Sequence, residues 1–154
     1  MALISRTDEA NARIGLLRRL ASISYDLLLV TALLMVLTGL VFLSRGGNAF
    51  NPQSAWFRLW LLTGWWAYFS WSWASGGQTV GMRAWRLVLR RRNGTAVGLG
   101  FATLRYFAAW VSGLALGLGF VWCLIDRDGL TWHDRLSGTM LVRRPKLSKP
   151  EDSD

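Results

Sequence analysis

Three long stretches of the chain are nearly free of charged residues. They cover residues 23–43, 55–75 and 101–125, and each contains one charged side chain. A helix rises about 1.5 Å per residue, so roughly 20 apolar residues cross the hydrocarbon core of a bilayer, which is about 30 Å thick. The pattern therefore predicts an all-α membrane protein with about three hydrophobic helical segments.

The three segments differ in detail. The first has no polar face at the helical period, unlike a helix on the surface of a soluble protein. The second has aromatic residues at both ends, which is typical of the interfacial belts of a spanning helix. The third contains Gly113, Gly117 and Gly119 and is too short for two full crossings. We expect this segment to cross once, or to be kinked or re-entrant.

Two of these glycines, Gly113 and Gly117, have the G-x-x-x-G spacing. On a continuous helix this spacing places both glycines on one face, where a second helix can approach closely. The pair is compatible with dimerisation and also with tight packing within one chain.

Composition narrows the classes of function. Of the 154 residues, 52% are hydrophobic and 18% are charged, and the formal net charge is +9. The many apolar side chains exclude intrinsic disorder, and a single cysteine excludes a disulfide scaffold. We expect no metal site, no cofactor and no enzymatic activity, because the chain lacks a cluster of metal ligands, a nucleophile–base pair and a phosphate-binding loop. Nucleic-acid binding is not expected either, because the basic residues flank apolar segments.

The basic residues predict an orientation in the membrane. Residues 1–22 carry several arginines, which favours a cytoplasmic N-terminus. The connection 44–54 then faces outward, and the next connection faces inward. A full crossing by the third segment would place the polar tail, residues 143–154, outside, whereas its lysines and arginines favour the inside. Both sides stay open for the C-terminus, with a slight preference for the cytoplasm.

The connection between the second and third segments is strongly basic. Asn93–Gly94 within it is a typical two-residue turn. We expect a short interfacial hairpin that faces anionic lipid headgroups, although the same charges also act as a plain topology signal. The basic residues of this loop are Arg83, Arg86, Arg90, Arg91 and Arg92.

Ionisable residues within the apolar segments are candidate functional residues. Asp26 lies about one turn inside the first segment, and Arg105 lies at a similar depth in the third. We predict a contact between them, direct or through water. The alternative is that Asp26 faces lipid headgroups.

A second cluster of charges follows the third segment and includes His133, Asp134 and Arg135. Such a cluster beside a membrane is compatible with a proton or cation site, and an unperturbed histidine titrates near neutral pH. The alternative is that Asp134 stabilises a turn before Gly138.

These residues together resemble the RDD family of small bacterial membrane proteins, named for one arginine and two aspartates. The resemblance runs from about Arg18 to Val142. The first motif is matched by Arg19 and Asp26. A glycine-threonine-glycine-basic motif is matched by Gly77, Thr79, Gly81 and Arg83. The last motif is matched by His133, Asp134, Arg135, Gly138 and Thr139. Arg90, Arg91 and Arg92 stand where many members are more acidic.

The resemblance implies a membrane domain of about three segments, here residues 23–142, in the bacterial inner membrane. Members of the family are described as transporters of unassigned ligands, and some are linked to cation/proton exchange. A chain this short needs an oligomer to enclose a pathway, so a homo-oligomer is expected. The alternative is an accessory or regulatory subunit that binds a larger inner-membrane protein complex.

Overall fold

The computed structural model describes residues 14–48, 51 and 53–144. The predicted cytoplasmic segment, residues 1–22, and the predicted tail, residues 143–154, lie in part outside the described residues. Over the described part, the chain forms six α-helices, one 3₁₀-helix and two short β-strands.

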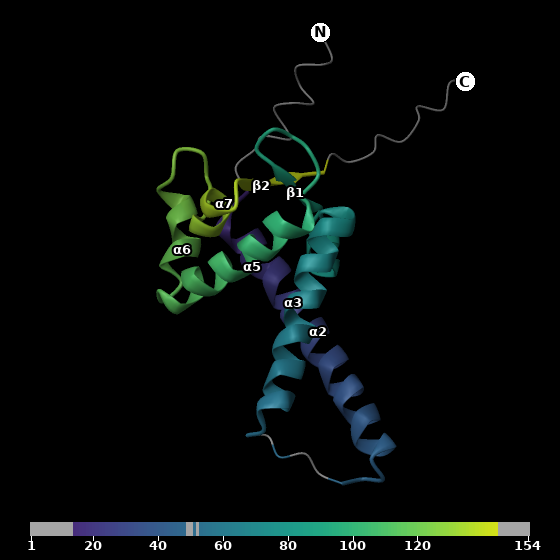
Figure 1. Ribbon diagram of the computed structural model, residues 1–154. Helices are drawn as coiled ribbons and strands as arrows, with labels where there is room; N and C mark the ends of the chain where they lie inside the picture. Colours follow the sequence, from purple (N-terminus) through teal and green to yellow (C-terminus); the bar gives the residue numbers. More distant parts are fainter. Residues whose placement is uncertain (1–13, 49–50, 52, 145–154) are drawn as a thin grey trace, which may run out of the picture.

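Two long helices, α2 (Leu16–Ser44) and α3 (Ala55–Gly76), run in opposite directions and are joined at the foot of the molecule (Figure 1). They diverge toward this connection. Apolar residues cover every side of α2, so many large side chains project outward: Leu28 is 74% exposed and Met35 is 70% exposed. Helix α3 ends where Gly77 adopts a left-handed backbone with φ of 67°, a conformation that favours glycine.

The other elements gather at the opposite end, beside the start of α2 and the end of α3 (Figure 1). They are the helices α4 (Val80–Ala84), α5 (Leu99–Leu114), α6 (Leu118–Val121) and α7 (Trp132–Leu136), the 3₁₀-helix η1 (Trp122–Leu124), and the strands β1 (Leu87–Arg91) and β2 (Thr139–Arg143). The two strands pair in an antiparallel sheet, with Leu89 opposite Leu141. Both ends of the described chain therefore lie at the same end of the molecule.

The basic connection does not form the predicted hairpin. The turn at Asn93–Gly94 is present, since the Gly94 N–H donates to the Arg91 carbonyl at 2.8 Å. The partner of β1, however, is β2 from the far end of the chain. Leu87 and Leu89 are fully buried, and pairing with β2 holds them in the core. The prediction of an all-α fold is corrected to a mostly helical fold with one small sheet.

The third hydrophobic segment is sharply bent, which agrees with the kinked or re-entrant alternative. The chain bends by 108° between helix α5 and the segment formed by α6 and η1. The chain turns at Leu116 and Gly117, where φ is 54° and 76°. After the turn, Gly119 packs on α5 so closely that a Cβ at this position would lie 2.5 Å from the Ser112 side chain. The bend thus depends on glycine at two positions.

The Gly113–Gly117 spacing does not form a helix-packing face. Gly117 lies beyond the end of α5, and a Cβ at Gly113 would meet no other atom within 4 Å. The break after α5 removes the continuous face that dimerisation through this pair requires.

By length and composition, α2 is the one helix in the described part of the chain that is apolar enough to cross a membrane. The bent segment formed by α5, α6 and η1 also qualifies if it is counted as a single span. Helix α3 is long enough but is not apolar enough to qualify. The expectation of three apolar spans is therefore supported for one segment, or for two.

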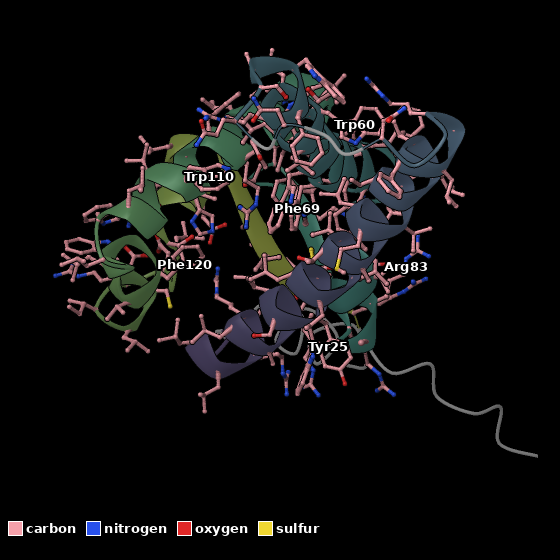
Figure 2. All side chains as sticks on the ribbon, turned by 90° about the horizontal axis from the view of Figure 1, so that it is seen from below. Tyr25, Trp60, Phe69, Arg83, Trp110 and Phe120 are labelled. Atoms are coloured by element: carbon pink, nitrogen blue, oxygen red, sulfur yellow. The ribbon has the colours of Figure 1, made fainter. Side chains whose placement is uncertain are left out.

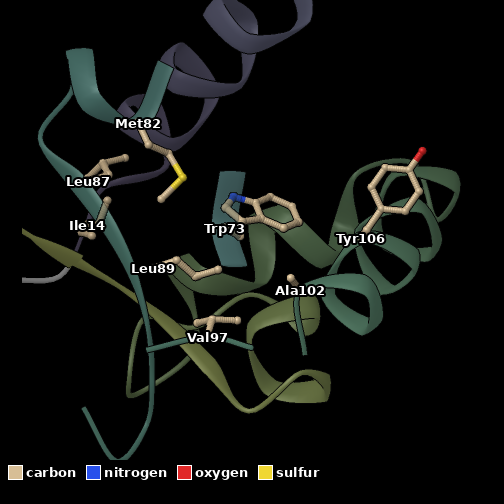
Figure 3. Close-up of a cluster of buried hydrophobic side chains, with 8 residues drawn as sticks. All are labelled: Ile14, Trp73, Met82, Leu87, Leu89, Val97, Ala102 and Tyr106. Carbon is tan, nitrogen blue, oxygen red and sulfur yellow. The ribbon is translucent and has the colours of Figure 1, made fainter. Parts of the chain in front are cut away.

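The buried core lies at the end of the molecule that carries the sheet. Figure 3 shows side chains from β1, α3, α4 and α5 in one cluster, with Leu89 placed between Val97 and Trp73. The cluster comprises Ile14, Trp73, Met82, Leu87, Leu89, Val97, Ala102 and Tyr106. This core holds together the helix ends that carry the candidate site.

Candidate functional site

Asp26 is held by three neutral hydrogen-bond donors. Its side chain is 2% exposed and lies on the face of α2 that meets α4. One carboxylate oxygen accepts from the Tyr68 hydroxyl at 2.8 Å and from the Gly81 N–H at 2.8 Å. The other oxygen accepts from the Thr79 hydroxyl at 2.5 Å. Buried polar groups need such partners, and here a hydroxyl of α3 and the first turn of α4 supply them.

The glycine-threonine-glycine motif has a structural explanation. Thr79 caps α4 by accepting from the Met82 N–H at 3.2 Å, while its hydroxyl donates to Asp26. At Gly81, a Cβ would clash with the Ser22 carbonyl oxygen and would lie 2.8 Å from Asp26 Oδ2. At Gly77, a Cβ would lie 2.8 Å from the Leu89 carbonyl oxygen. The motif therefore lets the chain turn and lets α4 approach α2 closely enough to bind Asp26.

Asp134 is the centre of a buried ion cluster. It is fully buried, and its two carboxylate oxygens pair with Arg19 at 2.7 Å and with Arg105. It also caps its own helix: the Thr131 N–H donates to the carboxylate at 3.1 Å, and the Asp134 N–H donates back to the Thr131 hydroxyl at 3.3 Å. Burial by itself raises the pKa of Asp134, but Arg105 and Arg19 outweigh it and hold the pKa well below its usual range. The carboxyl is therefore ionised.

Both arginines are anchored by further hydrogen bonds. Arg19 donates to the Gly129 carbonyl at 2.9 Å, and Arg105 donates to the Thr139 hydroxyl at 2.9 Å. Thr139 follows Gly138, which has φ of 62°. The cluster thus ties the start of α2 to α5, α7 and the start of β2, over a sequence separation of 115 residues between Arg19 and Asp134.

His133 is 4% exposed, and its ring lies 4.8 Å from the ring of Phe120. Burial lowers the pKa of His133 to about 3, and the charge of Arg105 contributes to the shift. The imidazole is therefore neutral at physiological pH, which does not fit a sensor that titrates near neutrality.

Arg135 forms a separate pair at the surface. It donates to Asp126 from two of its nitrogens, at 2.9 and 2.5 Å, and contacts Asp128 at 3.4 Å. The Arg135 side chain is 44% exposed, so this pair braces the loop before α7 and lies away from the buried cluster.

A direct contact between Asp26 and Arg105, one form of the prediction, is not formed. Each residue has other partners: Asp26 binds Tyr68, Thr79 and Gly81, and Arg105 binds Asp134 and Thr139. The sequence gives only an approximate depth for each of these residues along the membrane normal, and depth does not specify which helices pack together. Tyr68 was not predicted as a partner of Asp26, because nothing in the sequence distinguishes it from the neighbouring aromatic residues. The T-x-x-D spacing of the capping box, in contrast, is visible in the sequence before Asp134.

A cavity of about 330 Å³ lies beside the two aspartate sites. Its charged lining residues are Arg19, Asp26 and Arg105, and His133 and Tyr106 line it as well. Its apolar walls come mainly from α2, α3, α5 and α6, and Met82, Leu87 and Leu141 complete them. Seen from the foot of the molecule, Phe69, Trp110 and Phe120 lie around the space between α2 and α5 (Figure 2). Small-molecule sites commonly combine apolar walls with a few polar groups in this way, and they measure about 300–1,000 Å³.

Several buried polar atoms beside this cavity have no hydrogen-bond partner. They are Trp73 Nε1, Arg105 Nε, Tyr106 Oη and His133 Nδ1, and all four residues line the cavity. Unpaired buried polar groups are rare in proteins, and three of these four carry a hydrogen to donate. Over the described residues, no group of three or more His, Cys, Asp and Glu side chains is placed to hold a metal ion.

The arginines of the basic loop lie mostly at the surface. Arg83, Arg86, Arg90 and Arg92 are exposed. Arg91 is partly buried, and its guanidinium lies 4.0 Å from the centre of the Phe101 ring. Pairing of β1 with β2 adds Arg143 and Arg144, both exposed, to the same end of the molecule.

Comparison with known proteins identifies one family. The sequence model of the RDD family matches residues 13–138, which is most of the chain. No curated protein and no solved structure matches the chain. The match includes Arg19, Asp26 and Asp134, the three residues at the centre of the two buried sites.

Proposed function

This chain belongs to the RDD family, and we propose that it is a multi-pass protein of the bacterial cytoplasmic membrane whose cavity binds a small solute for transport. The observation that carries the proposal is the cavity of about 330 Å³, because motif residues Arg19, Asp26 and His133 line it together with Arg105. Charged groups buried within apolar segments generally serve binding or transport.

The distribution of apolar and basic side chains supports a membrane location. Helix α2 exposes large apolar side chains along its length, and α3 carries aromatic residues at both ends. The bent third segment returns toward the side from which it started, which suits a re-entrant segment. The exposed arginines at the sheet end then lie on the same side as the start of α2. By the charge rule this side is the cytoplasm, and strand β2, near the end of the described residues, lies there too.

The hydrogen bonding favours solute binding over ion exchange at the aspartates. Asp26 already accepts three hydrogen bonds, and Asp134 is paired with two arginines. A cation that bound either carboxylate would have to displace these donors. In this proposal, the two aspartates hold the walls of the cavity in place, and the solute binds between the walls.

The test is to block the cavity and measure transport. Gly113 lines the cavity, and a Cβ there would meet no neighbouring atom within 4 Å, so Gly113→Trp fills the space with little strain. Gly100→Trp is the matched control, because Gly100 also has open space and lies on the same helix outside the cavity. Proteoliposomes with a pH-sensitive dye would be exposed to gradients of sodium, potassium and organic anions.

We expect wild type and Gly100→Trp to move at least one solute, and Gly113→Trp to move none. Equal flux through wild type and Gly113→Trp would exclude the cavity as the pathway. Inert wild-type liposomes under every gradient would contradict transport itself.

A second candidate function is that of an accessory subunit in a larger membrane complex. The observation that favours it is the large apolar surface at the bend, where Leu116 is 93% exposed, Leu114 78% and Ile125 76%. Lipid or a partner helix can cover such a surface equally well. Purification in mild detergent distinguishes the two: an accessory subunit keeps a stoichiometric partner, whereas a transporter is recovered alone or as a homo-oligomer.

A further inference from the structure

We infer that the cavity takes an amphipathic solute with a single anionic head and a short apolar body. This inference rests on the proposed function, since it names the class of ligand that the same cavity binds. It is carried by three features of the cavity: the excess of positive charge at one end, the unpaired donors around it, and the apolar walls beyond.

The positive excess follows from the ion cluster. Arg19 and Arg105 are each 4% exposed, and they share one carboxylate, that of Asp134. Two guanidinium groups and one carboxylate leave one positive charge, and burial makes an uncompensated charge costly. An anion bound next to the arginines would supply the missing charge.

Asp26 does not supply this charge by direct contact. It lies seven residues beyond Arg19 on α2, a rise of roughly 10 Å. Its carboxylate accepts hydrogen bonds from Tyr68, Thr79 and Gly81. At one end of the cavity, the carboxylate of Asp26 therefore already has its hydrogen bonds. At the other end, Arg19 and Arg105 carry two positive charges against the single negative charge of Asp134.

The unpaired polar atoms favour a ligand that accepts hydrogen bonds. Trp73 Nε1 and Arg105 Nε are donors only, and the Tyr106 hydroxyl can also donate. Each of these residues lines the cavity, and the unpaired atoms themselves are closed to solvent, so a small shift of the side chains brings them into contact with a ligand. A carboxylate or a phosphate monoester offers several acceptors, whereas an ammonium group offers none.

The remaining walls select an apolar body. Among the other lining residues are Leu27, Trp65, Phe69, Trp110, Leu114 and Phe120. At about 30 Å³ for each water-sized group, 330 Å³ holds roughly ten such groups. The volume suits a medium-chain carboxylate.

The experiment measures binding of radiolabelled decanoate to the full chain in phosphatidylcholine nanodiscs, with empty nanodiscs as background. Decanol and decyltrimethylammonium replace the head by a neutral and a cationic group, and inorganic phosphate tests the anion without a tail. We expect saturable binding of decanoate, with decanol and the cation weaker by about tenfold or more. Decanol or the cation binding as tightly as decanoate, or phosphate displacing decanoate at equal concentration, would overturn the inference.

Two pairs of variants locate the site. Tyr106→Phe removes a hydroxyl that has no internal partner, so we expect it to weaken decanoate binding by about tenfold while the thermal midpoint stays the same or rises. Tyr25→Phe is its control, because Tyr25 is 57% exposed and lies outside the cavity. Gly113→Trp should abolish binding, and Gly100→Trp should retain it. Unchanged binding in both Tyr106→Phe and Gly113→Trp would overturn the site.

The outcome separates this inference from the proposed function. If Gly113→Trp stops transport but decanoate does not bind, the ligand class is wrong and the pathway stands. If decanoate binds in the cavity but no gradient drives flux, the ligand class stands and transport is wrong.

Discussion

The two buried aspartates are stabilised in contrasting ways. Asp26 is surrounded by neutral donors from α3 and from the first turn of α4, whereas Asp134 is paired with one arginine from α2 and another from α5. The first site docks a short motif on the long helix. The second site ties together segments 115 and 29 residues apart, and so closes the end of the molecule that carries the sheet. Replacing a neutral partner should therefore cost much less than removing the shared counter-charge.

The largest effect is expected for Asp134→Asn. It leaves Arg19 and Arg105 buried with no opposite charge, and the loss of one partner of a buried ion pair costs about 3–5 kcal/mol. The free energy of unfolding in mild detergent measures this loss. Asp26→Asn is the matched change at the other site, where about 1–3 kcal/mol is expected because no charged partner is left alone. Equal losses for the two variants would contradict the contrast.

A smaller effect is expected for Gly81→Ala. The added Cβ would clash with the Ser22 carbonyl oxygen and with Asp26, so α4 must move away from α2. Overpacking of this kind costs about 1–3 kcal/mol, and thermal unfolding would report it. Gly100→Ala is the control, since a Cβ there meets no atom within 4 Å. A Gly81→Ala protein as stable as the Gly100→Ala protein would show that the close approach is not needed.

The pH dependence of stability should report His133. Its pKa is about 3 in the folded chain and about 6.5 when unfolded, so its contribution is complete above about pH 6.5 and declines as the pH falls toward 3. The expected slope is roughly 1–2 kcal/mol for each pH unit. The corresponding window of Asp134 begins only below about pH 4, because its folded pKa is lowered from the usual carboxyl value.

Thermal midpoints of wild type and His133→Gln between about pH 7 and about pH 5 test this dependence. We expect wild type to lose stability on acidification and His133→Gln to lose less. Identical slopes would show that His133 is not the titrating group.

The smallest effect is expected for Tyr68→Phe. It removes one of the three neutral donors of Asp26 and should cost about 1 kcal/mol. Tyr25→Phe, at an exposed position, should cost nothing measurable in the same denaturation experiment. A loss comparable to that of Asp134→Asn would mean that the neutral donors are as important as the ion cluster.

Much of the local structure could be predicted from local patterns. The stretches nearly free of charge located two long helices and the bent segment that follows them, and the glycines near residue 117 indicated the bend that is observed there. These features depend on a few neighbouring residues, whose backbone preferences act over one or two turns. The prediction of a local hairpin at Asn93–Gly94 was wrong because the turn alone does not choose the partner strand.

Pairing between distant residues was decided by the tertiary structure. The sequence identifies Arg19, Asp26, Arg105 and Asp134 as unusual charges in apolar surroundings, but each charge could pair with several others at a similar depth. The bend after α5 and the docking of β2 on β1 bring Asp134 to the two arginines, and the close approach of α4 at Gly81 satisfies Asp26. Burial requires that each charge find a partner. Only the packing of the helices determines which partner is within reach.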